Sequence, residues 1–325
     1  MRIFLTGGAG FIGYHAARAL LDRGHSVVAL DDLNSYYDPQ LKRARLKELE
    51  AQPGFVFATG DIAQEDSLAK AAGGEIFDVV LHLAAQAGVR YALTDPRAYT
   101  RSNLVGHHNV LEFCRGMPRL GHLIYASSSS VYGNDTPAPY SESACAAQPV
   151  SFYGATKRSG ELMSHSYAEL FGLKQTGLRF FTVYGPWGRP DMAYWLFTDA
   201  ILKGKPIPVF GEGKLRRDFT YIDDIVDGIV RIVETPFKSE SGAAPHRLYN
   251  LGNSHPEDVL SLVRAIEQAA GKKAVIEAAE GPPGDVRETY ADITRAGRDF
   301  GFVPKISLEE GIGRFVAWFR RYHGL

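Results

Sequence analysis

Residues 6–13 read Thr6-Gly7-Gly8-Ala9-Gly10-Phe11-Ile12-Gly13 and separate a short apolar run, Ile3–Leu5, from a helix-like stretch, Phe11–Arg23. Glycines spaced G-x-x-G-x-x-G between a strand and a helix are typical of a site for a dinucleotide pyrophosphate. The first permits a tight turn, the second lets the main chain approach a phosphate, and the third lets the helix pack closely on the strand. The helix N-terminus adds free N–H groups and a positive dipole end. A glycine-rich turn without a ligand is the alternative at this point.

Two further strand ends favour a bound dinucleotide. Leu30-Asp31-Asp32 closes the apolar run Val27–Leu30, about 20 residues past the glycines, where a carboxylate accepts both hydroxyls of an adenosine ribose. Gly60-Asp61-Ile62 follows the run Phe55–Ala58, at a position that commonly meets the adenine. Because these ends line one crevice at the carboxyl edge of a parallel sheet, we expect NAD there. Asp31 would repel the 2′-phosphate of NADP.

The first half of the chain repeats this alternation of apolar runs and helix-like stretches. Further runs lie at Val79–Leu83, Leu123–Tyr125 and Thr176–Phe180, and helical patterns near Gln40–Glu50, Ser67–Ala71, Pro96–Cys114 and Ser151–Phe171. Strands that are apolar throughout indicate a sheet covered on both faces, so we expect an α/β fold with a Rossmann-type, doubly wound parallel sheet.

The alternation of apolar runs and helical stretches stops after Tyr184, where turn-forming residues are dense, and this change predicts a second lobe. We expect an NAD-binding Rossmann domain at residues 1–184, with 219–254 returning to it. A smaller α/β C-terminal lobe for the substrate is expected at 185–218 and 255–325, with helices near Pro256–Ala270 and Leu308–Arg320.

Tyr153 and Lys157 stand four residues apart in a helical stretch, and therefore on one face. A lysine cation beside a tyrosine favours the phenolate and lowers its pKa from about 10, which makes the phenol a usable base. The serine-rich stretch Ala126-Ser127-Ser128-Ser129-Ser130-Val131-Tyr132-Gly133 directly follows the run Leu123–Tyr125. An amphipathic helix and a polar loop are the plain alternatives for each feature alone. The glycine motif, the serines and the Tyr/Lys pair in this order are far more specific.

Composition excludes several classes. The 325 residues carry 36 Lys+Arg against 37 Asp+Glu, a net charge of −1, which leaves no basic field for nucleic acid. The chain has no apolar run near the roughly 18 residues that cross a membrane, so no membrane association is expected. Only two cysteines, Cys114 and Cys145, are present, without metal-ligand spacing, and a reducing cytoplasm is the default location.

The chain resembles the extended short-chain dehydrogenase/reductase family, in its NAD-dependent epimerase/dehydratase group, along essentially its whole length. Within that family it looks most like the branch that epimerises UDP-glucuronate at C4′. The resemblance is carried by Asp32–Asp38 with Leu41-Lys42, by Ala84–Tyr91, by Leu178–Ala193 and by Arg217–Ile225. It implies conversion of UDP-glucuronate to UDP-galacturonate through a transient 4-keto sugar, with tightly bound NAD+ as hydride shuttle. It also implies a homodimer formed through the helices at Pro96–Cys114 and Ser151–Phe171.

Carried over position by position, the resemblance implies three catalytic residues, Ser128, Tyr153 and Lys157, with Tyr153 as the base. It implies cofactor contacts from the last two of these and from Gly7, Gly10, Phe11, Ile12, Gly13, Asp31, Asn34, Lys42, Asp61, Ile62, Leu83, Ala84, Ala85 and Asn103. It places two arginines at positions that usually hold a nucleotide diphosphate, Arg217 and Arg287. Surface ion pairing is the alternative for both arginines.

Sister activities are disfavoured by two serines. Related 4,6-dehydratases carry Asp-Glu just before the Val-Tyr-Gly, and related decarboxylases carry Glu directly before that Val, where this chain has Ser129 and Ser130. We hypothesise that these serines and Thr182 hold the sugar carboxylate against loss of CO2. Arg90 and Arg189 are candidates for balancing its charge, with surface ion pairing as the alternative.

Three rival functions stay open. A UDP-glucose/UDP-galactose 4-epimerase, or an enzyme of dual specificity, would use the same three catalytic residues; such epimerases commonly carry Asn where Thr182 stands. A non-catalytic NAD-binding protein is disfavoured by the intact Ser128, Tyr153 and Lys157. An NADP-linked reductase that releases its cofactor is disfavoured by Asp31.

Overall fold

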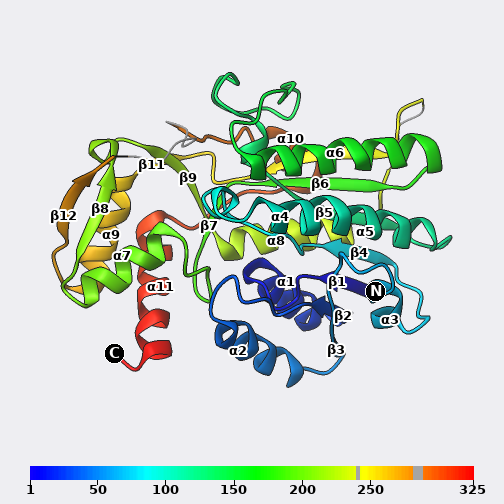
Figure 1. Ribbon diagram of the computed structural model, residues 1–325, viewed down its shortest axis with the longest axis horizontal. Coiled ribbons are helices and arrows are strands. Elements are labelled where there is room, and N and C mark those ends of the chain that lie inside the picture. Colours follow the sequence, from blue (N-terminus) through cyan, green and yellow to red (C-terminus); the bar gives the residue numbers. More distant parts are fainter. Residues whose placement is uncertain (239–241, 281–287) are drawn as a thin grey trace. The chain divides into compact units, whose positions relative to one another are not determined.

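The main sheet confirms the expected fold class. The computed structural model describes residues 1–238, 242–280 and 288–325. Its largest sheet has the strand order β10-β6-β5-β4-β1-β2-β3 (Figure 1). Its strands are β1 (Arg2–Thr6), β2 (Ser26–Asp31), β3 (Phe55–Thr59), β4 (Val79–His82), β5 (His122–Ser128), β6 (Gln175–Phe180) and β10 (His246–Leu251). From β6 to β3 every neighbouring pair is parallel.

Helices connect these parallel strands. They are α1 (Phe11–Asp22), α2 (Pro39–Glu50), α3 (Ser67–Ala72), α4 (Pro96–Tyr99), α5 (Gly106–Arg115) and α6 (Phe152–Phe171), with short turns η1 (Tyr91–Leu93) and η3 (Ser129–Val131). β1 lies between β2 and β4, so the chain builds the sheet outward from β1 in both directions. In a sheet of this order the ligand crevice opens where the direction of building reverses, at the carboxyl ends of β1 and β4.

The core of this sheet is apolar on both faces, as strands buried between two helix layers require. Ile3, Phe4 and Leu5 of β1 are fully buried, and so are Val80 and Leu81 of β4. Phe4 packs edge-on against Phe77, with ring centroids 5.1 Å apart. The continuous apolar runs in the sequence are therefore interior strands.

Contacts divide the chain into two compact units. The first comprises Met1–Asp135, Cys145–Phe180 and Val226–Tyr249, and the second comprises Thr136–Ala144, Phe181–Ile225 and Asn250–Leu325. One helix, α8 (Ile222–Glu234), and strand β10 each contribute residues to both units.

The second unit holds two small sheets and four helices among its described residues. The sheets are β11-β9-β7, formed by β7 (Thr182–Tyr184), β9 (Arg216–Tyr221) and β11 (Pro256–Asp258), and the parallel pair β8 (Pro206–Phe210) and β12 (Val275–Ala279). The helices are α7 (Ala193–Leu202), α9 (Val259–Ala270), α10 (Thr294–Phe300) and α11 (Leu308–His323), with a short turn η4 (Gly211–Gly213). Aromatic rings fill its interior, as where Trp195 meets Phe319 with centroids 5.2 Å apart.

The borders between the units differ from the expected ones. Residues 136–144, 181–184, 219–225 and 250–254 were expected with the first domain, but their contacts place them in the second unit. The amide of Tyr140 donates to the carbonyl of Tyr290 at 2.6 Å, and Asn250 Nδ2 donates to the carbonyl of Tyr140 at 2.7 Å. Pairings across such long stretches of chain leave no periodic signal in the sequence.

Two helix predictions need correction. The stretch expected as a helix from Pro256 begins as β11, antiparallel to β9, and becomes helical only at Val259, where Asp258 caps α9. The helix expected over Pro96–Cys114 is divided by a π-helical segment, η2 (Thr100–Val105), between α4 and α5. Such segments add a residue to one turn and often occur at functional sites.

The described ranges contain neither a candidate membrane span nor a candidate metal cluster. No helix among residues 1–238, 242–280 and 288–325 is both long and apolar enough to cross a membrane. In the same residues, no group of three or more His, Cys, Asp or Glu side chains is placed to hold a metal ion.

Candidate active site

The loop between β1 and α1 has the geometry of a phosphate cradle. Gly7 adopts φ +79°, and a Cβ there would lie 2.7 Å from the amide nitrogen of Ala84. A Cβ on Gly13 would lie 2.0 Å from the carbonyl oxygen of Gly7. Gly10 begins α1 with no side-chain cap, so the backbone N–H groups of the first turn are not used by a capping side chain. Only glycine fits at Gly7 and Gly13, and the loop fits a pyrophosphate laid on a helix N-terminus.

Asp31, at the end of β2, connects the ribose position with the cradle. Its Oδ2 accepts the amide of Ala9 at 3.2 Å, and its Oδ1 accepts the amide of Leu33 at 2.9 Å. Burial raises the pKa of this carboxyl, while Lys42 opposes the rise. Lys42 is itself buried and donates from Nζ to the carbonyl of Asn34 at 3.0 Å. The structure thus brings Asp31, Asn34 and Lys42 together beside the cradle, and their contact with a cofactor stays a prediction.

Asp61 follows β3 and is partly buried. Arg101 Nη2 donates to its Oδ2, and the amide of Ala63 donates to its Oδ1 at 2.8 Å. Its neighbour Ile62 is buried in the apolar core. Asp61 therefore has protein partners in this structure, and its proposed contact with adenine stays a prediction.

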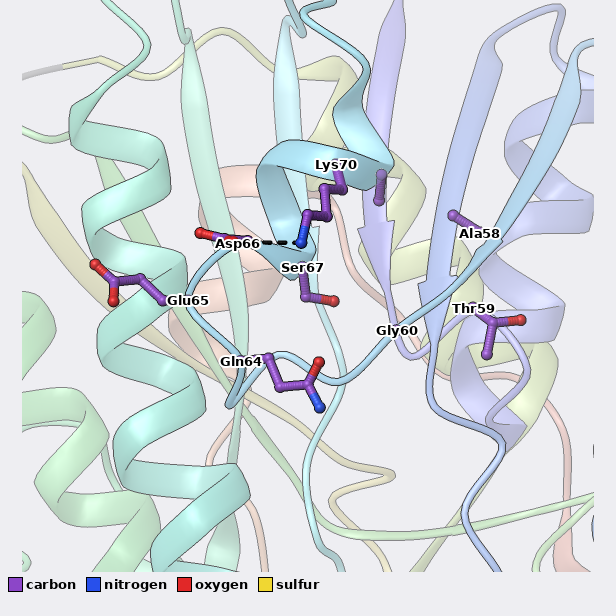
Figure 2. A pocket seen from close by; sticks show the side chains of 9 residues that line it. Ala58, Thr59, Gly60, Gln64, Glu65, Asp66, Ser67 and Lys70 are labelled. Carbon is purple, nitrogen blue, oxygen red and sulfur yellow. Dashed lines mark hydrogen bonds and ion pairs between the residues drawn. The ribbon is translucent and has the colours of Figure 1, made fainter.

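A surface hollow also lies beside β3, but it is not built from the predicted site residues. Figure 2 shows Gln64, Ser67 and Lys70 around this hollow, with Lys70 paired to Asp66 at 3.2 Å. Most of the side chains that line it are exposed. It has the character of a solvated groove beside an edge strand.

The end of β4 is tied to the cradle and to α6 by hydrogen bonds. The amide of Ala84 donates to Thr6 Oγ1 at 3.2 Å, which holds this strand end against the end of β1. The amide of Gln86 donates to Asn103 Oδ1 at 2.8 Å, and Asn103 Nδ2 donates to Thr156 Oγ1 at 3.0 Å. Asn103 is buried and lies in the π-helical segment η2. Its side-chain amide therefore reaches both the residues after β4 and helix α6 from that segment.

Tyr153 and Lys157 occupy the first turns of α6. Ser151 caps the helix by accepting the amide of Gly154 at 3.0 Å, which fixes where the helical spacing begins. Lys157 Nζ lies 6.0 Å from the centroid of the Tyr153 ring. The ring of Tyr99 meets the Tyr153 ring edge-on, with centroids 6.0 Å apart. The pair thus shares one helix face, as the four-residue spacing predicted.

Lys157 connects this helix with the strand that carries the serines. Its Nζ donates to the carbonyl of Ala126 at 2.9 Å, two residues before Ser128. Burial lowers the pKa of Lys157 to about 8, and Glu161 opposes that effect. Glu161 is engaged elsewhere, because Arg179 holds both its oxygens at 2.8 Å. The lysine is therefore buried beside the tyrosine with its pKa close to neutral pH.

Ser128 ends β5 and is buried. Its hydroxyl accepts the amide of Ser130 at 3.2 Å, which starts the short turn η3. Ser129 and Ser130 are only partly buried in that turn. The serine-rich stretch is thus an ordered end of a strand and the turn after it.

Of the three predicted substrate arginines that the structure describes, two lie in the second unit. In the second unit, Arg189 pairs with Asp191, Nε to Oδ1 at 3.0 Å, as a surface ion pair would. Arg217 lies on β9 and donates from Nη1 to the carbonyl of Arg216 at 2.9 Å. Arg287 lies outside the described residues. Thr182 begins β7, and the exposed Arg90, in the first unit, precedes η1.

Sequence reasoning missed three residues around the tyrosine and the cradle. Tyr99 packs on Tyr153 and donates to the carbonyl of Ala87 at 3.0 Å. Thr156 receives the Asn103 amide, and Arg45 donates to the carbonyl of Ala9 at 2.8 Å. Arg45 stands one helical turn after Lys42, so the shared face of that helix was an available signal. No pattern in the sequence pointed to Tyr99 or Thr156.

Comparisons with known proteins identify the family. The model of the NAD dependent epimerase/dehydratase family matches residues 3–252. UDP-glucuronate 4-epimerase 1 of Arabidopsis thaliana is 47% identical over 332 residues, which cover 99% of this chain and 77% of that protein.

Two solved structures are similar along the chain. The UDP-glucuronic acid 4-epimerase of Bacillus cereus in complex with UDP-glucuronic acid and NAD has a TM-score of 0.91 and 35% identity, covering 99% of this chain and 100% of that one. The UDP-glucose 4-epimerase of Thermotoga maritima with UDP-glucose has a TM-score of 0.86 and 30% identity, with the same two coverages. On its sequence, its sheet and its family match, the chain belongs to the NAD-dependent epimerase/dehydratase family.

Proposed function

We propose that this chain is a UDP-sugar 4-epimerase that interconverts UDP-glucuronate and UDP-galacturonate with NAD as its cofactor. The observation that carries the proposal is the buried Lys157, which lies beside Tyr153 and is hydrogen-bonded to the strand that ends in Ser128. The relatives and structural neighbours support the substrate, since they include UDP-glucuronate 4-epimerases.

When bound, NAD+ would supply the hydride acceptor for C4′ of the sugar and, in its reduced form, the hydride donor for the opposite face. The protein's own part is the proton. Tyr153 takes the proton of the 4′-hydroxyl as a general base and gives it back after the configuration has inverted. The Lys157 cation stabilises the phenolate, and Ser128 donates a hydrogen bond to the same sugar oxygen.

The cradle and the strand ends around it hold the cofactor. Residues 7–13 would hold its pyrophosphate, Asp31 with Asn34 and Lys42 would hold its ribose, and Asp61 and Ile62 would hold its adenine. The second unit then carries the sugar nucleotide, with Arg217 and Arg287 on its diphosphate. Support for this division comes from the glycine geometry in the first unit and from the family match.

Ser129, Ser130 and Thr182 hold the sugar carboxylate in the proposed complex. A 4-keto uronic acid is a β-keto acid and loses CO2 readily, so the enzyme must keep its carboxylate away from the orientation that favours that loss. Hydroxyl groups bind a carboxylate without supplying an acid or a base at neutral pH. Arg90 and Arg189 are the candidates for balancing the negative charge, and Arg189 is paired with Asp191 in this structure.

A UDP-glucose/UDP-galactose 4-epimerase is the second candidate. The Thermotoga maritima neighbour favours it, because it is a UDP-glucose 4-epimerase of the same fold. Thr182 argues for the acid, since the family's glucose epimerases commonly carry Asn there. Both substrates use the same Tyr153 chemistry, so the two candidates differ only in what surrounds C5′ and C6′.

The proposed enzyme is a homodimer that works in the cytoplasm. Apolar side chains on α6 and its neighbouring π-helical segment are exposed in the first unit: Leu162 at 55%, Leu170 at 70% and Val105 at 46%. Burying such a patch in a second copy would stabilise the pair. Two free thiols, Cys114 and Cys145, suit a reducing compartment. Sedimentation of the wild type and of Leu162→Glu tests the dimer, and a wild type that sediments as a monomer would contradict it.

Incubation with separate UDP-sugars tests the function directly. The purified protein, without added NAD, is mixed with UDP-glucuronate or UDP-glucose, and NMR follows the 4-epimer of each. We expect UDP-galacturonate from the first at a rate at least about 100-fold above that from the second, because the site is matched to a carboxylate. Faster epimerisation of UDP-glucose would favour the second candidate.

Two variants separate the roles of the side chains. Tyr153→Phe should remove epimerisation of either sugar while leaving bound NAD in place, because only the base is lost. Thr182→Ala should release a UDP-pentose alongside the epimer. Unchanged epimerisation with no pentose would count against the role given to Thr182.

A further inference from the structure

A fully buried arginine lies beneath the phosphate cradle. Arg45 is on α2, and its side chain is 0% exposed. Arginine is almost never buried completely unless hydrogen bonds satisfy its guanidinium. Among its bonds, Nη1 donates to the carbonyl of Ala9 at 2.8 Å and to the hydroxyl of Tyr37 at 2.8 Å. A cation is therefore placed against the loop that would carry a pyrophosphate.

The contact with Ala9 is one half of a clamp. Ala9 lies between Gly8 and Gly10 in the middle of the loop, and it is fully buried. Its amide donates to Asp31 Oδ2 at 3.2 Å, and its carbonyl accepts from Arg45 at 2.8 Å. The residue is thus held on both its N–H and its C=O, by the end of β2 and by α2.

Tyr37 gives this clamp a second support. The guanidinium carbon of Arg45 lies 5.7 Å from the centroid of the Tyr37 ring, and Lys42 Nζ lies 5.1 Å from the same centroid. Two cations from one helix therefore meet one aromatic ring in the segment that follows the ribose aspartate. Cation–aromatic contacts at this range are attractive. They account physically for why this segment carries Tyr37, Lys42 and Arg45 together.

We propose that Arg45 is a positioning residue that holds the phosphate loop in its binding conformation and adds positive potential to it. Through the loop it slows the release of NAD. The inference rests on the NAD cofactor of the proposed function, but not on the identity of the sugar.

This role matters because the proposed reaction needs the same cofactor for both of its halves. An enzyme that loses the reduced cofactor between them stops with an oxidised sugar. Glycines leave the loop main chain free to adopt other conformations, and every such conformation costs binding energy. A clamp on the middle of the loop removes that freedom before the cofactor arrives.

Exchange of bound NAD tests the proposal on the holoenzyme. The purified protein is mixed with isotopically labelled NAD, and the rate of exchange is followed for the wild type, Arg45→Met and Arg43→Met. Arg43 lies on the same helix but is exposed, which makes it a matched control. We expect about 10- to 100-fold faster exchange for Arg45→Met, the range for a lost hydrogen bond to a charged group. Arg43→Met should match the wild type.

Two displacing ligands locate the effect. ADP-ribose carries the pyrophosphate and adenosine does not, so the wild type should need far less ADP-ribose than adenosine to displace NAD. In Arg45→Met that advantage should shrink by roughly the factor seen in the exchange rate, since only the pyrophosphate contacts weaken. The KM for UDP-glucuronate, measured with excess NAD, should stay within about twofold. A wild-type exchange rate and an undiminished advantage of ADP-ribose would overturn the proposal, whatever happened to thermal stability.

Milder variants keep the test decisive if Arg45→Met does not fold. Arg45→Lys keeps the positive charge but loses the planar guanidinium group, which can donate to two acceptors at once. The rate of NAD exchange should therefore lie between that of the wild type and that of Arg45→Met. Tyr37→Phe removes one partner of Arg45 and should speed exchange about twofold to fivefold. Wild-type exchange in both variants would contradict the clamp.

Discussion

Each of the two units contains a buried aspartate whose carboxylate accepts hydrogen bonds from backbone amides. Asp31, in the first unit, accepts two backbone amides, those of Ala9 and Leu33. Asp218, in the second unit, is fully buried and accepts three, from Asn253 at 2.6 Å and from Ser254 and Ala291 at 3.0 Å. Burial raises the pKa of both carboxyls.

The difference between them is the distance along the chain that each one spans. Asp31 joins a loop only 22 residues away, at a spacing that the dinucleotide-binding pattern repeats in many proteins. Asp218 joins segments 35, 36 and 73 residues away, and its own pattern is not repeated in the sequence. A buried aspartate that binds backbone amides can therefore be predicted from the sequence in the first unit but not in the second, although the chemistry of the two sites is the same.

Removal of the Asp218 carboxylate should have the largest effect. Asp218→Ala leaves three backbone amides and the Thr220 hydroxyl without their acceptor, which should cost on the order of 3–5 kcal/mol of folding free energy. Arg217, the neighbouring residue on β9, should lose its position, so the KM for UDP-glucuronate should rise about tenfold or more while NAD exchange stays unchanged.

Chemical denaturation and steady-state kinetics check this prediction. Glu212→Ala is the control, because Glu212 is an exposed partner of Lys214 in the same unit and its loss should leave both measurements unchanged. A wild-type denaturation midpoint for Asp218→Ala would show that the buried carboxylate does not hold the unit together.

Replacement of the other aspartate should act on the cofactor. Asp31→Asn keeps the size of the side chain but loses the charge that faces the ribose, and NAD affinity should fall about 10- to 100-fold. Affinity for NADP should fall less, since the repulsion of its 2′-phosphate is gone. Titration of both cofactors measures this, with the exposed Asp22→Asn on α1 as the control. An equal loss of affinity for NAD and NADP would show that the charge of Asp31 does not distinguish the two cofactors.

Acid should widen the stability gap between the wild type and Asp218→Asn. A carboxyl whose pKa is raised by folding keeps its proton to a higher pH in the folded state, so its contribution to stability is fully present below the ordinary value of 3.8. That contribution is lost as the pH rises through the folded pKa. Asparagine does not titrate, so the difference in Tm should be larger at pH 4.5 than at pH 7. If the difference in Tm became smaller at acid pH, the pKa of Asp218 would be lowered by folding and not raised.

A hydroxyl beside the second aspartate should have the smallest effect. Thr220 donates to Asp218 Oδ1 at 3.0 Å and is buried, so Thr220→Val should cost about 1 kcal/mol, the value of one such bond. The same substitution at the exposed Thr59 should be neutral or slightly stabilising, because valine suits a strand. Equal losses at the two positions would mean that the bond to Asp218 contributes nothing measurable.

Local patterns were enough for the first unit. Its strands appeared within a few residues of where apolar runs predicted them. The interior strands β1, β2, β4, β5 and β6 are buried on both faces, and the edge strand β3, with Val56 57% exposed, is still marked by its aromatic and β-branched residues. The Tyr153–Lys157 pair followed from helix spacing alone. The π-helical segment at Thr100–Val105 could not be predicted, since only the bonds of Asn103 to Gln86 and Thr156 explain it.

The second unit was harder to predict from the sequence, because its elements depend on pairing between distant segments. Pro256–Asp258 forms a strand only because β9 is there to pair with it, although its residues continue into a good helix. Residues 136–144 joined this unit through bonds of Tyr140 to residues more than 100 positions away. Such pairings depend on two distant segments at once, and a pattern within either one does not reveal them.

The order of residues alone determined the parallel sheet, the glycine cradle and the shared face of the tyrosine and lysine, because each follows from spacing within about 20 residues. Only the folded chain decided that Arg45 lies under Ala9 and that the Lys157 ammonium is buried enough to bring its pKa to about 8. Burial and long-range hydrogen bonds are properties of neighbours in space, and these neighbours come from separate parts of the chain.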